Sequence, residues 1–139
     1  MNSEFGPMVL LLETGPHLYR RRLTLHQAVL VPSTLKALNK AGLSIEDIDI
    51  FEINEAFAVQ VLSFLDYFNI ADDDPRVNQF GGAIAVGHPL ASSGVRLMIN
   101  MARGFENNPK ARFGITTMCI GLGMGATVIW ENSFAEGRK

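Results

Sequence analysis

One histidine stands in a backbone segment that should hold it in place. His88 lies within the run 81–90, directly between Gly87 and Pro89. Glycine permits backbone angles that are closed to other residues, while proline fixes its own φ angle and restricts its neighbour. We therefore expect the imidazole to be aimed at a defined point instead of moving freely at a surface.

Two further polar side chains lie where expected elements of secondary structure end. Asn54 follows an apolar stretch, and Cys119 precedes the alternating glycines Gly121, Gly123 and Gly125. A cysteine and a histidine carried on loops are typical of thiol acid/base or nucleophilic chemistry. An imidazole and an amide N–H would also suit a substrate oxygen that becomes negative during acyl or enolate chemistry.

Each of these residues also has a plainer interpretation. Asn54 could cap a helix that starts at Glu55, and Cys119 could be a small core side chain, as most free cysteines are. The glycines count against the second interpretation, because they remove side chains and leave backbone N–H groups free to face a ligand. They do not indicate a dinucleotide site, since no helix or downstream acid of the expected kind follows.

Other polar residues carry no predicted chemistry. His17 and His26 are interpreted as exposed or linker histidines, and the three consecutive acids at 72–74 as a solvated loop. We predict neither a metal site nor a bound cofactor.

Periodicity and turn signals place the elements that would position the site. They predict a helix from Pro32 to Gly42, a strand over 47–53 with alternating charged and apolar residues, a helix over 55–68, a glycine-rich loop over 81–90, a helix from Ser92 to Asn107, and strands over 113–118 and 126–130. A further strand could lie over 9–12, with a turn at 15–16. This order predicts an α/β layer domain that ends in a hairpin.

Composition narrows the class of protein. The chain has 139 residues, 47% of them hydrophobic and 19% charged, with a net charge of −2. That balance argues against a nucleic-acid partner or an anionic membrane surface, and no stretch is long and apolar enough to span a bilayer. The single cysteine, Cys119, fits a reducing, cytoplasmic setting. The high apolar content suits either a sheet covered on both faces or one part of a larger assembly.

Three motifs together resemble the C-terminal domain of thiolases, the acetyl-CoA acetyltransferases and 3-ketoacyl-CoA thiolases. The motifs are Asn-Glu-Ala-Phe at 54–57, Gly-Gly-Ala-Ile-Ala-x-Gly-His-Pro at 81–89 with Ser-Gly-x-Arg at 93–96, and Cys-x-Gly-x-Gly at 119–123. The resemblance covers 32–132. It leaves 1–31 as an atypical segment, interpreted as an added leader or as out of family, and 133–139 as a polar tail that frays from Glu131 onward. It implies an α/β/α layered domain with a mixed central sheet.

The resemblance also implies a role for each matching residue. His88 would help to deprotonate a nucleophilic cysteine and would donate to the thioester oxygen of the second acyl-CoA. Asn54 would hold the water that completes this oxyanion hole, and Cys119 would be the general acid/base at the α-carbon of acetyl-CoA. The backbone N–H of Gly121 would contribute to a second oxyanion hole. Coenzyme A and its thioesters would be substrates, in fatty acid metabolism such as β-oxidation.

One departure from the family limits what this sequence could do alone. A thiolase has an N-terminal half that carries the nucleophilic cysteine, and here the only cysteine, Cys119, matches the acid/base position. We expect the chain to be inactive alone, to need the N-terminal half as a partner, and to expose apolar surface on the helix over 55–68 or on the one after Ser93. The parent enzyme is expected to be a homo-oligomer.

Two other functions stay open at this point. The chain could be a non-catalytic acyl-CoA-binding or scaffold module derived from a thiolase, although such a module would not need Asn54, His88 and Cys119 together. It could also be a thiol hydrolase that uses Cys119 as nucleophile with His88.

Overall fold

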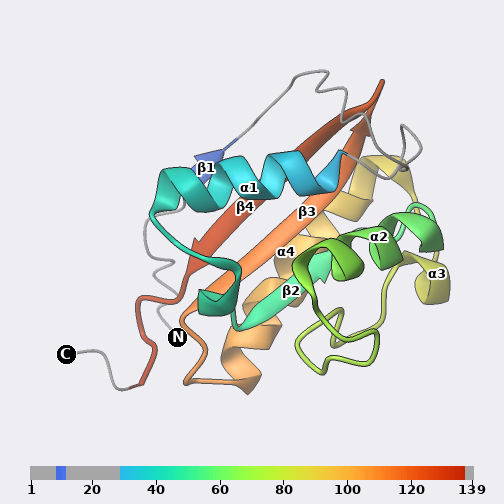
Figure 1. Cartoon of the computed structure of the whole chain (residues 1–139). Helices are drawn as coiled ribbons and strands as arrows, with labels where there is room; N and C mark the ends of the chain where they lie inside the picture. Colours follow the sequence, from blue (N-terminus) through green and yellow to red (C-terminus); the bar gives the residue numbers. More distant parts are fainter. Residues whose placement is uncertain (1–8, 12–28, 137–139) are drawn as a thin grey trace.

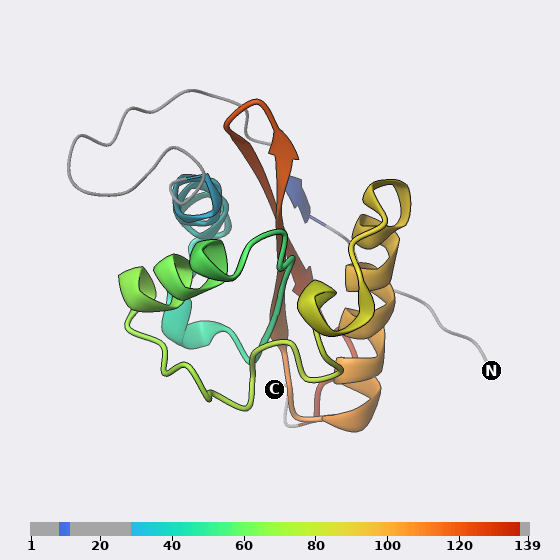
Figure 2. The ribbon, with the colours of Figure 1, turned by 90° about the vertical axis from the view of Figure 1, so that its right-hand side faces the viewer.

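The computed structural model describes residues 9–11 and 29–136. A mixed four-stranded sheet lies between two layers of helices, so the expected α/β/α layered fold is confirmed (Figures 1 and 2). The turn expected at 15–16, together with His17 and His26, lies outside the described residues.

The sheet has the order β1-β4-β3-β2. Its strands are β1 (Val9–Leu11), β2 (Ile50–Ile53), β3 (Phe113–Gly121) and β4 (Met124–Glu131). The pair β2–β3 is parallel, with Ile53 opposite Thr117, whereas β4 is antiparallel to both β3 and β1. The strand expected over 9–12 is therefore present as an edge strand, and the last two strands form the expected hairpin.

Two helices cover one face of the sheet and a third covers the other (Figure 2). The helices are α1 (Leu30–Ala41), α2 (Ala58–Phe68), the short α3 (Ala83–Val86) and α4 (Leu90–Asn107). A 3₁₀ turn, η1 (Ile45–Asp47), precedes β2. Contacts of α1 with β3 and β4, and of α4 with β2 and β3, tie both layers to the sheet.

Several predicted boundaries are wrong, for local reasons. The strand expected over 47–53 begins only at Ile50, because Ser44 and Asp47 form a capping box around η1. Helix α2 begins at Ala58 instead of at 55, and α4 begins at Leu90, directly after Pro89. The stretch predicted as a glycine-rich loop contains the helix α3.

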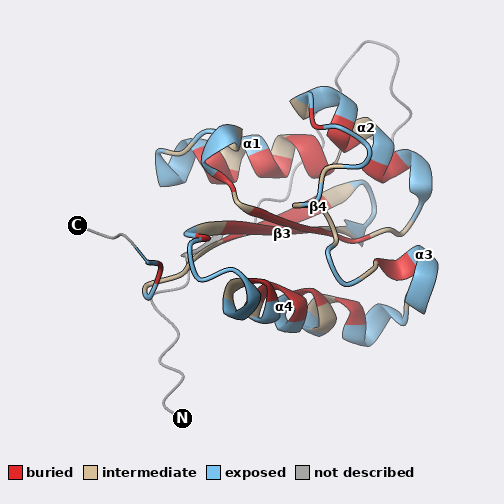
Figure 3. Cartoon of the chain, turned by 90° about the horizontal axis from the view of Figure 1, so that it is seen from below, coloured by how far each residue is buried: buried red, intermediate tan, exposed pale blue. Residues whose placement is uncertain are grey.

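The core lies on both sides of β2. Phe51 and Ile53 pack toward α1 and α2, whereas Ile50 packs with Met101 of α4. Buried residues line the sides of the helices that face the sheet (Figure 3). All four residues of β2 are buried, including Glu52 at 1% exposure. The alternation of charged and apolar residues in this strand thus does not mark an exposed face, because a parallel strand between two helical layers has none.

The β3–β4 hairpin turns through Leu122 and Gly123. Gly121, Leu122 and Gly123 all have positive φ angles, of 92°, 52° and 74°. A two-residue turn with positive φ at both central positions matches the twist of antiparallel strands, and β3 therefore runs to Gly121, beyond the predicted end at 118.

The described end of the chain is held in place. Asn132 N donates to Arg112 O at 2.8 Å, and Glu136 N donates to Pro109 O at 2.9 Å. Ala135 is buried. The expectation of a frayed segment from Glu131 is therefore wrong as far as Glu136.

Large apolar side chains remain exposed on or next to three helices, near the hairpin tip and in the segment after β4. Those exposed by more than two fifths are Phe57, Val59, Leu62, Tyr67, Ile84, Val86, Leu90, Val95, Met98, Ile99, Ile120, Leu122 and Phe134. The two helices expected to expose apolar surface, α2 and α4, both do so.

Candidate functional site

Asn54 and Cys119 lie at the ends of two neighbouring parallel strands. Asn54 comes directly after β2, and Cys119 lies near the end of β3. Because the carboxyl ends of parallel strands meet at the same edge of a sheet, both residues lie at that edge. The backbone confirms this, since Asn54 N donates to Thr117 O at 2.9 Å, two residues before Cys119.

The structure brings Asn54 and His88 together across 34 residues of sequence. Asn54 Nδ2 lies 3.4 Å from His88 Nε2, and Asn54 is fully buried. Its Oδ1 atom is also buried and has no hydrogen-bond partner. The interpretation of Asn54 as a helix cap is wrong, because α2 starts at Ala58 and its N-cap position is Phe57.

The other imidazole nitrogen is bound by Ser93 from the first turn of α4. Ser93 Oγ lies 2.6 Å from His88 Nδ1 and 3.1 Å from Pro89 O. Pro89 O already accepts two backbone N–H groups, from Ser92 and Ser93 at 2.9 and 3.0 Å. The hydroxyl has one proton, and the tautomer follows from where it goes. If it goes to Pro89 O, Nδ1–H donates to Ser93 Oγ and Nε2 accepts from Asn54 Nδ2; if it goes to Nδ1, the imidazole proton lies on Nε2.

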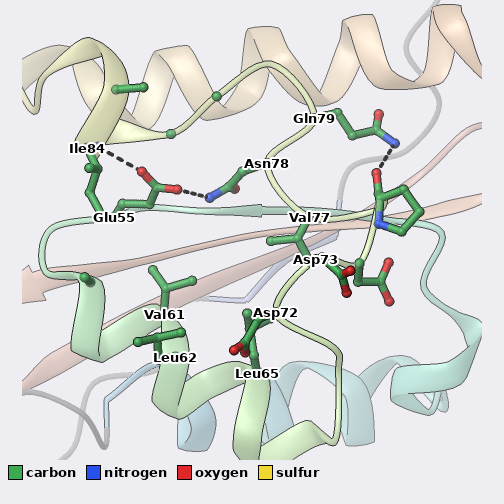
Figure 4. Close-up of a pocket in the computed structure, with 16 residues that line it drawn as sticks. Glu55, Val61, Leu62, Leu65, Asp72, Asp73, Val77, Asn78, Gln79 and Ile84 are labelled. Carbon is green, nitrogen blue, oxygen red and sulfur yellow. Dashed lines mark hydrogen bonds between the residues drawn. The ribbon is translucent and has the colours of Figure 1, made fainter.

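Glu55 fastens the segment that leads to His88. One carboxylate oxygen accepts from Ile84 N in the first turn of α3, and the other accepts from Asn78 Nδ2, both at 2.8 Å (Figure 4). A Cβ atom at Gly82 would lie 1.9 Å from Glu55 Cδ, so a larger residue there would displace this carboxylate from its two hydrogen bonds. Adjacent residues thus hold the loop at two points, Asn54 at the imidazole and Glu55 at α3.

Cys119 lies on the same edge but on its own strand, partly exposed. It is not a member of either core cluster, which counts against its interpretation as a core side chain. Its cross-strand partner is Gly125, and a bulge follows between Cys119 and Gly121. Among the described residues no hydrogen bond joins Cys119 to His88.

The three glycines after Cys119 each have a structural reason. Gly121 and Gly123 have positive φ angles at the hairpin turn. At Gly125 a Cβ atom would lie 2.2 Å from Val29 O, so this glycine admits the start of α1. The expectation that all three clear space for a ligand is therefore wrong for Gly125.

A buried acid lies beneath the His88 loop, and the sequence interpretation missed it. Glu52 Oε2 accepts from Asn100 Nδ2 of α4 at 3.1 Å, while Oε1 is buried without a partner. Burial raises the pKa of Glu52 from 4.5 to about 7; the Asn100 hydrogen bond and the Arg96 charge oppose this, and Glu55 adds to it. The available signal was a carboxylate inside an otherwise apolar strand.

A separate hollow of about 720 Å³ lies between α2 and the 72–82 segment (Figure 4). Its wall includes Glu55, Leu62 and the acids 72–74, but not Asn54, His88 or Cys119. Asp74 is bound by Arg76 at 2.7 Å, and Asp72 and Asp73 are exposed, as a solvated loop would be.

Within 9–11 and 29–136 no group of three potential metal ligands comes together. No helix in the described part of the chain is long and apolar enough to cross a membrane.

Comparison with known proteins gives the family. The family model of the thiolase C-terminal domain matches residues 24–132. The chain is 50% identical over 101 residues to a 3-ketoacyl-CoA thiolase of Psychrobacter arcticus, and 51% over 102 residues to one of Saccharophagus degradans. It is 48% identical over 101 residues to the 3-oxoadipyl-CoA/3-oxo-5,6-dehydrosuberyl-CoA thiolase of Escherichia coli. Each match covers 73% of this chain but only 25 to 26% of the relative, so the chain spans about a quarter of the curated relatives it matches. The protein therefore belongs to the thiolase family, of which it contains the C-terminal domain.

Proposed function

We propose that this chain supplies the acid/base half of a thiolase active site, for CoA-dependent cleavage of a 3-ketoacyl-CoA or the reverse Claisen condensation. The observation that carries the proposal is the Asn54–His88 pair, whose imidazole is anchored by Ser93. The relatives named as 3-ketoacyl-CoA thiolases support the choice of reaction.

The pair is suited to bind a thioester oxygen as it becomes negative. With the proton on His88 Nε2, the Nδ2 and Nε2 atoms stand 3.4 Å apart, which is long for a hydrogen bond but short enough for two donors to share one acceptor. Asn54 would act directly or through a water, and its burial keeps the amide from turning toward bulk solvent. Donors fixed in advance stabilise developing charge because they need no reorganisation.

Ser93 would let His88 serve as a base as well. When the neutral ring carries its proton on Nε2, the hydroxyl donates to Nδ1; when Nδ1 is protonated as well, Nδ1–H donates to Oγ and the hydroxyl donates to Pro89 O, 3.1 Å away. Both protonation states of the imidazole thus keep a hydrogen-bonded Nδ1. This switch supports a role for His88 in taking the proton of a nucleophilic thiol.

Cys119 would move the proton of the carbon acid. In condensation its thiolate takes a proton from the α-carbon of acetyl-CoA, and the resulting enolate attacks the carbonyl of an acyl-cysteine, whose thiolate leaves as the new carbon–carbon bond forms. In cleavage the nucleophilic thiolate attacks the 3-keto carbonyl, the same carbon–carbon bond breaks, and the Cys119 thiol gives its proton to the α-carbon. CoA then takes the acyl group from the acyl-cysteine, whose thiolate leaves. The N–H of Gly121, beyond the bulge, would donate to the oxygen of the acyl-cysteine.

The acyl-cysteine must come from residues outside this sequence. Its single cysteine occupies the acid/base position, so we propose that the 139-residue chain is inactive alone and works against a thiolase N-terminal half. The apolar faces of α2 and α4 support this, because contiguous exposed apolar surface is typical of interfaces.

A chimera provides the test. The matching segment of the Psychrobacter arcticus thiolase is replaced by this chain's segment, and cleavage of acetoacetyl-CoA and of longer 3-ketoacyl-CoA thioesters is measured. We expect activity in the chimera, loss of it in His88→Ala and Cys119→Ala, and none in the 139-residue chain. A folded but inactive chimera would favour a scaffold function. Acyl transfer to Cys119 in the isolated chain would instead support a thiol hydrolase.

A further inference from the structure

Arg96 holds the peptide that carries His88. Arg96 Nη1 donates to Gly87 O at 2.6 Å, the carbonyl of the residue immediately before the histidine. The other side of Gly87 is held as well, because its N–H donates to Ala83 O of α3 at 2.9 Å. Gly87 has φ and ψ angles of 89° and 162°, a conformation that only glycine adopts readily, so its own backbone preference does not define the orientation.

Helix α4 therefore binds both the imidazole of His88 and the peptide that precedes it. Ser93 binds the ring at Nδ1, and Arg96, one turn further along α4, binds the backbone before it. A ring held only at Nδ1 could still swing with the peptide plane behind it. The ring and the peptide before it are thus both bound, and Nε2 lies 3.4 Å from Asn54 Nδ2.

A buried carboxyl group on β2 acts electrostatically on the guanidinium. Its Nε and Nη2 atoms are buried without a partner, and so is Oε1 of Glu52 on β2. The Arg96 charge acts on the Glu52 carboxyl group, and Asn100, one turn beyond Arg96, binds the other carboxyl oxygen at 3.1 Å. Buried atoms of both side chains thus lie between β2 and α4, where the Arg96 charge favours the ionised form of Glu52.

We propose that Arg96, backed by the buried Glu52, is a positioning residue that aims His88 Nε2 by holding the Gly87 carbonyl. This inference rests on the proposed function, because aiming His88 matters for catalysis only if the imidazole meets the thioester oxygen. Neither Arg96 nor Glu52 touches the reacting atoms in this account.

The first test follows the His88 imidazole itself. ¹⁵N NMR of the 139-residue chain, with the His88 signals assigned by their loss in His88→Ala, reports which ring nitrogen carries the proton. We expect a single tautomer in the wild type and an averaged mixture in Arg96→Met, with part of the wild-type signal restored in Arg96→Lys. Arg103→Met, at an exposed position on the same helix, is the matched control and should leave the signals unchanged.

The second test is kinetic and uses the chimera. Arg96→Met should lower kcat by about 10- to 100-fold with little change in KM, as misplacement of a catalytic group does, while Arg103→Met keeps the wild-type values. If Arg96→Met fails to fold, Glu52→Gln/Arg96→Met removes both buried charges and is compared with Glu52→Gln alone. Folded variants with unchanged His88 signals and kcat would overturn the proposal. An inactive wild-type chimera would overturn the proposed function but not the role of Arg96. The NMR experiment would still show whether Arg96 orients the imidazole.

Discussion

Replacement of Glu52 by glutamine should change how the stability of the chain depends on pH. The pKa of Glu52 is about 7 in the folded protein, against 4.5 for the ordinary group. A raised carboxyl pKa means that the fold binds the proton more tightly than the unfolded chain does. The stability that the folded protein gains from the protonated Glu52 is therefore complete below about pH 4.5, and it is lost as the pH rises through 7. A difference of 7 − 4.5 = 2.5 pKa units corresponds to about 3 kcal/mol.

Urea denaturation of wild type and Glu52→Gln between pH 4 and pH 8 provides the assay, with the difference between the two as the measured quantity. Glutamine has nearly the same shape as glutamate, and its amide oxygen can still accept the hydrogen bond from Asn100. It does not titrate in this pH range. The free energy of unfolding of the variant should rise relative to wild type by about 3 kcal/mol from the acid to the alkaline end. The exposed Glu106→Gln on α4 should give a flat difference. A flat difference for Glu52→Gln would refute the reasoning.

Three further predictions concern packing and surface. Gly82→Ala should lower the free energy of unfolding by about 1–3 kcal/mol in thermal denaturation, because its methyl group meets the Glu55 carboxylate, whereas Gly94→Ala has room and should not destabilise. Thr127→Val should cost about 1–3 kcal/mol, because three buried hydroxyls share Thr127 Oγ1 and would lose it; an unchanged urea midpoint would contradict this. The isolated chain should self-associate in sedimentation velocity, and Leu62→Lys on exposed α2 should reduce the association; a monomer at high concentration would contradict the interface.

Local sequence signals predicted the order of the helices and strands and the ends of those elements at which the site residues lie. Gly42 stops α1 with a φ angle of 68°, and the break after Asn107 ends α4, as the sequence indicates. The placement of Asn54 directly after β2 and of His88 next to Gly87 followed from the same kind of signal. What depends only on neighbours in the chain could be predicted.

Contacts between distant segments could not be predicted from such patterns. Nothing local in the sequence shows that Glu55 binds Ile84 N, or that Asn54 lies against His88, because each contact joins segments that are far apart in the chain. The burial of Glu52 was missed for the same reason: a charged residue in a short strand looks exposed until both faces are known to be covered. Gly125 was interpreted as clearing space for a ligand, because the sequence does not show that Val29 O approaches it.

The most direct test of the central claim is acetoacetyl-CoA cleavage by the chimera with Asn54, His88 and Cys119 intact and then altered one at a time. The account predicts CoA-dependent cleavage by the intact chimera, with kcat lowered by about 100-fold or more in His88→Ala and Cys119→Ala and by a smaller factor in Asn54→Ala. A folded, active chimera that keeps its kcat in His88→Ala or Cys119→Ala would contradict it.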